Sequence, residues 1–244
     1  MKIVVEEQHK PYGLHRLGIA AHVFVDTWAH QGFAGVSHRV NDVNHVRREK
    51  LPDPHFKNKL VRFFGSVFQE GIAPIGHSAA LSYPDRPFLR WSYENGLNER
   101  VERDNPKDFT DAADELCKWI RRFVARDAEA SVKGLPDSVR EIISNLFTSL
   151  DDGKPSRRHQ KWLKAISDDA FGIGAVNLDY RPKGVGSWKH KALGVTTKKD
   201  SKKARFPFSK DFLTCDWRLF HDAAKAHRLS VVDDVLPRYG ICVV

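Results

Sequence analysis

The strongest hydrophobic pattern in the chain lies between residues 12 and 32. Apolar side chains recur there at positions 14, 17, 21, 24, 25 and 28, close to the spacing of one face of an α-helix. Gly32 follows the last of them and predicts the helix end, because glycine readily adopts the left-handed conformation that closes a helix. The same reasoning predicts further helices over residues 58–70, 105–130, 136–150, 157–171 and 212–235.

Two long stretches lack this periodicity. Residues 71–95 hold three Pro and two Gly among many aromatic residues, which predicts an irregular segment packed on a core. Residues 172–209 are rich in Gly and basic residues and predict a long loop. Strand patterns are few, mainly residues 2–5 and 241–244. The pattern therefore predicts a mostly α fold: a single helical domain over residues 1–244 with long irregular loops at 71–95 and 172–209.

Composition narrows the class of protein. Hydrophobic residues make up 41% of the 244 and aromatic residues 11%, which is enough for a folded core. No apolar run reaches the roughly 18–20 residues that span a bilayer, and the start of the chain has no apolar core typical of a signal peptide. Three widely separated cysteines argue against a disulfide framework. Together these features predict a cytoplasmic protein without a transmembrane segment.

The net charge of +9 is concentrated towards the C-terminus. Residues 1–150 carry a net charge of +1 and residues 151–244 a net charge of +8. Within the latter, residues 181–210 hold ten Lys or Arg and one acid. Such a segment is either a solvated mobile loop or a surface that binds polyanions. The candidates for contacting an anionic substrate are Arg39, Lys198, Lys199, Lys202, Lys203 and Arg205.

Three residues on the first long helix are candidate metal ligands. His22, Asp26 and His30 follow one another at intervals of four, and each such step advances about 40° around a helix. They therefore share one face, and imidazole nitrogen with carboxylate oxygen suits Zn²⁺. A His and an Asp can also form an ordinary hydrogen-bonded pair. Because the other faces of this helix are apolar, we expect it to be buried, where such a row is costly without a metal or a partner.

Residues of the 71–95 segment are candidates to complete the site. His77 follows Gly76, and we expect it to be a fourth metal ligand. Asp85 is expected to bridge a metal or to orient a histidine, and His30 to serve as a ligand or as a base. An Asp at this position can instead cap its own turn.

Several blocks of the sequence resemble one family. RLGIAAHVFVDTWAHQGFAGVSHRVN (16–41) is similar to the hallmark H-x-x-x-D-T-W-A-H-Q-G-F of a mostly bacterial family of unknown function, and residues 74–95, 103–116 and 216–231 resemble its later blocks in order. The resemblance implies that His22, Asp26, His30 and His77 lie on family motif positions. It also implies a chain that is short at its N-terminus, since family members carry a further His/Asp-containing segment there, which a partner chain would then supply.

A more distant resemblance, through the pair His22 and Asp26, is to the zinc-dependent phospholipase C and single-strand nuclease superfamily. It implies hydrolysis of phosphodiester bonds in nucleic acid or phospholipid headgroups. We therefore expect a zinc-dependent phosphodiester hydrolase with metal ligands His22, Asp26, His30 and His77 and with His30 and Asp85 as catalytic residues. The alternative is a non-catalytic or split-subunit member that binds a partner or a polyanion through its basic loop.

Overall fold

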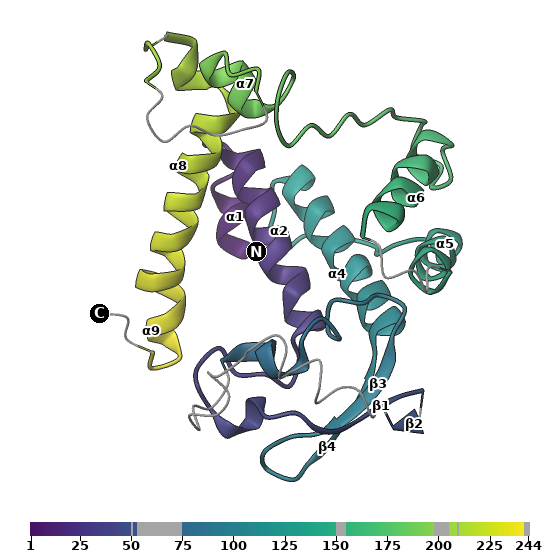
Figure 1. Ribbon diagram of the computed structural model, residues 1–244. Coiled ribbons are helices and arrows are strands. Elements are labelled where there is room, and N and C mark those ends of the chain that lie inside the picture. The colour runs from purple at the N-terminus through teal and green to yellow at the C-terminus, as the bar shows by residue number, and fades with distance from the viewer. Residues whose placement is uncertain (50, 53–74, 150–154, 198–204, 209, 242–244) are drawn as a thin grey trace. The chain divides into compact units, whose positions relative to one another are not determined.

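The structure is a computed structural model that describes residues 1–49, 51–52, 75–149, 155–197, 205–208 and 210–241 (Figure 1). The chain groups into two compact units. The first unit consists of residues 1–24, 118–132 and 177–244, and the second of residues 25–117 and 133–176. The border between them runs through helices α2 (Gly13–Ala29) and α4 (Asn105–Ala125), so each helix contributes residues to both units.

An antiparallel sheet in the second unit corrects the prediction of a mostly α, single helical domain. Its strands are β1 (Asn44–Arg48), β2 (Leu51–Pro52), β3 (Arg90–Glu94) and β4 (Arg100–Asp104), in the order β2-β1-β3-β4. The pair β3 and β4 forms a hairpin in continuous register. The fold of the described residues is therefore mixed α/β (Figure 1).

The hydrophobic pattern did not predict these strands, and the reason is physical. β1 reads NHVRR and β4 reads RVERD, so neither shows the alternation of apolar and polar residues that marks a half-buried strand. In β3, Trp91, Ser92 and Tyr93 are all buried, which removes the alternation there as well. This strand also lies inside the proline-rich segment that predicted irregular structure.

The core of the second unit is built on this sheet. Its buried members are Val43, Val46, Ala79, Ala80, Tyr83, Leu89, Trp91 and Tyr93. The rings of Trp91 and Tyr93 stack with centroids 5.0 Å apart, and Tyr83 meets Trp91 edge to face at 5.5 Å. Residues 75–95 thus pack on a core as expected, but they are not irregular throughout, because they contain the 3₁₀ helix η3 (Gly76–Ala80) as well as β3.

Helices complete the second unit near the positions that the sequence predicts. The C-terminal part of the unit holds α5 (Asp137–Thr148) and α6 (Pro155–Ser167). Phe109 of α4 packs against Phe147 of α5 with ring centroids 5.7 Å apart, and Phe147 packs against Trp162 of α6 at 5.4 Å. The predicted helix over residues 58–70 lies outside the described residues.

The first unit is helical in its described residues. It contains α1 (Lys2–Glu6), α7 (Trp188–Leu193), the 3₁₀ helix η4 (Lys210–Thr214) and α8 (Asp216–Leu229), followed by a π-helical segment, η5 (Ser230–Val235), and by α9 (Leu236–Arg238). Helix α7 lies inside the predicted loop 172–209. The predicted strand at residues 2–5 is wrong: this segment is α1, which buries Val4 and Val5, since a run of four residues is too short for its period to separate strand from helix.

Helix α2 is amphipathic rather than buried on all sides, which corrects a second prediction. In the first unit its buried face passes through Gly13, Arg16 and Ala20, whereas Leu14 is 73% exposed. Arg16 forms an ion pair with Glu7 and donates a hydrogen bond to Ser230 Oγ at 2.6 Å.

None of the described helices combines the length and the apolar character that crossing a membrane requires.

Candidate metal centre

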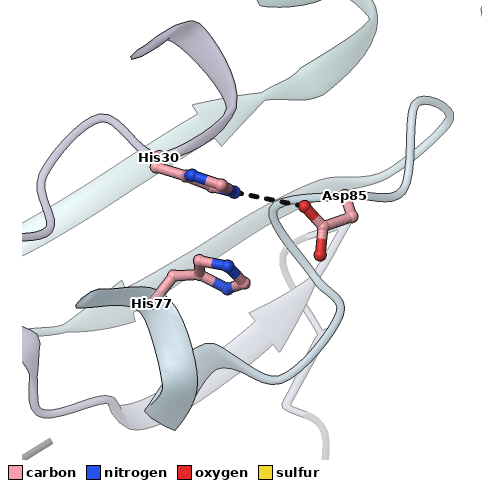
Figure 2. Close-up of side chains that lie close together, drawn as sticks. All are labelled: His30, His77 and Asp85. Carbon is pink, nitrogen blue, oxygen red and sulfur yellow. Dashed lines mark hydrogen bonds and ion pairs between the residues drawn. The ribbon is translucent and has the colours of Figure 1, made fainter. Parts of the chain in front are cut away.

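Three side chains from distant parts of the chain meet in the second unit (Figure 2). His30, His77 and Asp85 each offer one potential ligand atom, and these atoms lie within 4.8 Å of one another. His30 Nε2 is 3.2 Å from Asp85 Oδ1. The imidazole rings of His30 and His77 stack with centroids 4.1 Å apart and an interplanar angle of 20°. Two nitrogens and a carboxylate oxygen are thus directed into one small volume.

His30 stands where helix α2 ends. Its main-chain N–H donates to the carbonyl of Asp26 at 2.9 Å, which extends the helical hydrogen bonding by one residue. Two residues later, Gly32 has φ = +88°, and a side chain there would be strained because this is the left-handed region. The chain therefore turns sharply just after His30, and the imidazole lies at the helix terminus, facing the turn that carries Asp85 (Figure 2).

Arg103 holds this helix terminus from strand β4. Its side chain is only 4% exposed and pairs with Asp108 at 2.9 Å. Because the last carbonyls of a helix have no intrahelical partner, a guanidinium with several N–H donors is well suited to them. Arg103 donates to the main-chain carbonyls of Trp28 (2.6 Å), Ala29 (3.1 Å) and Gln31 (2.9 Å). The backbone is thus anchored on both sides of His30.

His77 is oriented by its own short helix. Its Nδ1 lies 3.2 Å from the carbonyl oxygen of Leu81. A carbonyl oxygen only accepts, so Nδ1 is the donor in this contact, and Nε2 is the ring nitrogen that is left to bind a metal ion. Leu81 has φ = 55° and ψ = −130°, a conformation that costs a non-glycine residue of order 1–3 kcal/mol. This strain places the carbonyl that orients the His77 ring.

Asn41 holds the segment that follows His30. It is fully buried, accepts a hydrogen bond from the N–H of Ala34 at 2.7 Å, and donates to the carbonyls of Ala34 and Val36 at 3.1 and 2.8 Å. The carbonyl of Ala34 also accepts from the N–H of Gly76 at 2.9 Å. The buried amide therefore holds the segment after His30, and the main-chain hydrogen bond between Gly76 and Ala34 joins this segment to the one that carries His77.

Asn105 holds the turn that carries Asp85. Its Nδ2 donates to the carbonyls of Tyr83 and Arg86, both at 2.8 Å, and its Oδ1 accepts from Trp91 Nε1 at 3.2 Å. The neighbouring Asp104 has a different role, because its Oδ1 accepts from the N–H of Lys107 at 3.2 Å near the start of α4, whereas Asn105 is fully buried.

The cluster is open to solvent. The side chain of His30 is 30% exposed and that of Asp85 is 51% exposed. At metal–ligand distances of about 2.0–2.2 Å, the ligand atoms of a tetrahedral zinc site lie about 3.3–3.6 Å apart. His30 Nε2 and Asp85 Oδ1, which are 3.2 Å apart, are already close to this separation. Catalytic zinc sites commonly have three protein ligands, such as two imidazoles and one carboxylate, and leave a further position open to water. This donor set is therefore of the catalytic kind and not that of a closed structural site.

The other predicted metal ligands lie outside this cluster. His22 is exposed and Asp26 is half-buried, and neither belongs to the group of ligand atoms that the described residues bring together. His30 leaves the expected helical row because α2 ends at Ala29. Their assignment as ligands stays a prediction, whereas His30, His77 and Asp85 are brought together by the fold.

Two of the predicted anion-binding residues lie among the described residues. Arg39 is exposed at the start of the 3₁₀ helix η1 (Arg39–Asn41), and Arg205 is exposed in a segment without regular secondary structure. The four lysines predicted with them, Lys198, Lys199, Lys202 and Lys203, lie outside the described residues. Polyanion binding by these residues stays a prediction.

Sequence reasoning missed the buried polar residues behind the cluster. Arg103 and Asn105 both lie in the block RDNPKDFTDAADEL, where the only signal was the resemblance of that block to the family motif. Tyr93, in the core below, was also not singled out. Burial raises the pKa of its hydroxyl to about 12, so Tyr93 stays protonated at neutral pH and cannot act as a base.

Comparison with known proteins yields one match. The model of the Family of unknown function (DUF6765) matches residues 1–235, and the chain belongs to this family. Membership in a family of unknown function, which the sequence motifs predicted, is thereby confirmed. Neither the search of curated proteins nor the search of solved structures returned a match.

Proposed function

We propose that this member of DUF6765 binds one divalent metal ion, zinc by preference, through His30, His77 and Asp85 and uses it to hydrolyse phosphodiester bonds. The observation that carries the proposal is the convergence of these three donors within 4.8 Å of one another. They come from the end of a helix, a 3₁₀ helix and a turn, which local sequence alone does not bring together.

The supporting residues favour a site over an ordinary hydrogen bond between His30 and Asp85. A half-exposed His–Asp pair adds little stability, typically 0–1 kcal/mol. Around it, however, Arg103 and Asn41 are buried and hydrogen-bonded to the segments on either side of His30, and Asn105 is buried and hydrogen-bonded to the turn that carries Asp85. Such residues behind the ligands fix their orientation in metal centres, where their loss commonly lowers metal affinity by about 10–100-fold.

The chemistry follows from the donor set. A bound divalent ion supplies a Lewis acid for the phosphoryl oxygen and makes water more acidic. His30 Nε2 and Asp85 Oδ1 face each other at 3.2 Å, and both atoms would turn to the ion when it is bound. The second carboxylate oxygen of Asp85, Oδ2, would then accept the proton of the attacking water. In the reaction the water oxygen forms a bond to phosphorus, the bond from phosphorus to the leaving alkoxide breaks, and the alkoxide is protonated from solvent.

The phosphodiester substrate class rests on the donor set, because a divalent ion held by two imidazoles and a carboxylate can polarise a phosphoryl oxygen. It does not rest on His22 and Asp26, which lie outside the proposed site. A local feature supports an anionic substrate. Arg86 follows Asp85 in the same turn, where its Nε donates to Ser82 Oγ at 3.2 Å and its guanidinium lies over the ring of Tyr83. A guanidinium held in this way is a suitable partner for phosphate oxygens.

Metal content and hydrolysis test the proposal together. We expect about one zinc ion per purified chain and zinc-dependent cleavage of bis-p-nitrophenyl phosphate. His30→Asn, His77→Asn and Asp85→Asn should each lose both properties. His45→Asn is the matched control, because His45 forms a comparable exposed pair with Glu94, at 3.5 Å, and has φ = 48°, which Asn tolerates.

A fifth variant separates this site from the predicted helical row. His22→Asn should retain the metal and the activity. A wild-type protein without stoichiometric metal after zinc loading would overturn the proposal, as would metal retained in all three site variants. Metal binding without cleavage of any phosphodiester would support the metal site and contradict the proposed hydrolase activity.

A further inference from the structure

The first unit contains a cavity of about 660 Å³ that the metal centre does not use. It is lined by residues 179–197, which include helix α7, and by residues of helix α8, which packs beside α7. Its volume falls within the range of about 300–1,000 Å³ typical of small-molecule sites. The segments that form it lie entirely within the first unit.

The aromatic side chains that line the cavity, here called the aromatic wall, are Tyr180, Trp188, Trp217 and Phe220. Tyr180, Trp188 and Phe220 are 70%, 46% and 40% exposed. Trp188 and Phe220 pack against each other with ring centroids 5.9 Å apart. A concentration of exposed aromatic rings is unfavourable in water and commonly marks a binding site. Flat rings of this kind bind planar ligands by stacking.

Cationic side chains line the same cavity. Arg181, Lys183, Lys189 and Lys191 contribute four positive charges, and Asp179 contributes one negative charge. Arg181 Nε is 2.6 Å from Asp179 Oδ2, and Lys189 Nζ lies 5.8 Å from the centre of the Trp217 ring. The lining is therefore aromatic and carries an excess of positive charge, which favours a ligand that is both planar and anionic.

Buried contacts hold this arrangement. Ser187 is buried, donates to the carbonyl of Gly184 at 2.7 Å and accepts from the N–H of His190 at 3.2 Å. Gly186 has φ = +86°, and a Cβ there would lie 3.0 Å from Arg181 Cδ, so the turn brings its backbone against the Arg181 side chain. The basic segment is thus joined to α7 by a defined turn.

A partly buried histidine supports the aromatic wall. His15 Nε2 lies 3.1 Å from Asp216 Oδ1, and its ring meets the ring of Trp188 edge to face at 5.6 Å. The carboxylate accepts from Nε2, which fixes the plane of the imidazole. Trp188 is thereby held in the cavity wall before any ligand arrives.

We propose that this cavity binds a nucleotide, with its base against the aromatic wall and its phosphate on the cationic residues. A phosphorylated nucleobase satisfies both halves of the lining, whereas a bare polyphosphate leaves the rings in water and a neutral aromatic compound leaves the cations unused. The same chemistry occurs in a free nucleotide and in one residue of a single strand. The proposal goes beyond the hydrolase and does not depend on the metal centre.

Isothermal titration of the full chain with defined probes tests it. AMP should bind at least about tenfold more tightly than either adenosine or inorganic phosphate, because each of these lacks one of the two interactions. Trp188→Ala should weaken AMP binding by about tenfold, and Trp188→Phe, which keeps a flat ring, should restore most of it. Lys183→Gln combined with Lys191→Gln should weaken AMP binding and leave adenosine binding unchanged. Lys164→Gln, an exposed lysine of the second unit, is the control and should bind normally.

A second comparison distinguishes the two sources of the ligand. Tighter binding of a twelve-residue oligothymidylate than of dTMP, with a steep salt dependence, would identify a single strand. Equal affinity would identify a free nucleotide. Tripolyphosphate binding as tightly as ATP with no effect of Trp188→Ala would show attraction by charge alone and overturn the proposal, as would no measurable binding of AMP, ATP and the oligonucleotide at millimolar concentration.

Discussion

Arg103 Nη2 donates a hydrogen bond to the carbonyl of Trp28 at 2.6 Å across 75 residues of chain. The contact joins the last strand of the sheet to the C-terminal end of α2, next to the histidine that we assign to the metal centre. The position of His30 therefore depends on a side chain that is not itself one of the proposed metal ligands.

Replacing Arg103 should damage stability and metal binding together. Arg103→Lys keeps the charge but loses the planar set of donors that three carbonyls and Asp108 share, which we expect to lower the free energy of unfolding by about 2–3 kcal/mol. Urea denaturation monitors this loss. Arg100→Lys is the control, because Arg100 pairs with Glu102 at the surface and its replacement should change stability by less than about 0.5 kcal/mol. Equal effects of the two variants would contradict the role given to Arg103.

Asn105 should control the affinity of the metal centre without touching the metal. In Asn105→Asp the amide donor is lost, so the carbonyls of Tyr83 and Arg86 lose their partner and face a carboxylate instead. We expect zinc affinity to fall by about 10–100-fold, measured by competition with a chelating dye. Asn98→Asp, at an exposed turn position with φ = 60°, should leave the affinity unchanged. An unaltered affinity in a folded Asn105→Asp protein would refute the role of this residue.

Zinc should stabilise the protein, and its removal should reverse the effect. Free zinc at 100 times its Kd adds about 2.7 kcal/mol to the free energy of unfolding when the unfolded chain does not bind the ion. Differential scanning calorimetry should show a higher Tm with zinc and a return to the lower value with EDTA. His77→Asn should melt at the same temperature in both conditions. A wild-type Tm that zinc and EDTA leave unchanged would count against the site.

The first unit should lose stability in acid through His227. Its pKa lies below the ordinary value of 6.5 because of burial, and secondarily because of the positive charges of Arg16 and of the N-terminal amino group. The unfolded chain therefore binds the proton more readily than the folded one, so the stability linked to His227 is present above pH 6.5 and is lost as the pH falls through the lower, folded pKa.

A comparison of stability at pH 7 and pH 5 measures this linkage. His227→Gln cannot titrate, and its unfolding free energy should decline less between these pH values than that of the wild type. His9→Gln, which replaces an exposed histidine of the same unit, should decline as the wild type does. A wild-type-like decline in His227→Gln would contradict the expectation.

The predicted elements differ in how far local sequence could specify them. The helices α4, α5 and α6 follow from apolar residues at helical spacing, because an amphipathic helix displays its buried face in its own sequence. The strands β1 and β4 carry mostly charged and polar residues, so their composition does not indicate strands. They form strands because they pair with β3. The antiparallel sheet was therefore missed.

The residues of the candidate site also differ in how far local sequence could specify their roles. His30, His77 and Asp85 were singled out from residue type and motif, but they were grouped with His22 and Asp26 through the geometry of a continuous helix. In the structure, however, α2 ends at Ala29, and Arg103 binds the carbonyl of Gln31 beyond the helix end. A continuous helix predicts neither feature. The ligand set proposed here thus differs from the predicted one by the exchange of two helical residues for Asp85 as a metal ligand.

By itself the sequence determined the positions of the main helices, the family and the residue types from which a metal centre can be built, because these depend on local spacing and chemical identity. Only the tertiary structure decided which donors meet. Hydrogen bonds from Arg103 hold the helix end, those from Asn105 hold the turn, and the bond from the Gly76 N–H to the carbonyl of Ala34 joins the start of the 3₁₀ helix to the segment after His30. Such contacts join residues up to 75 positions apart, and the local periodicity of the sequence does not indicate which residues pair over that distance.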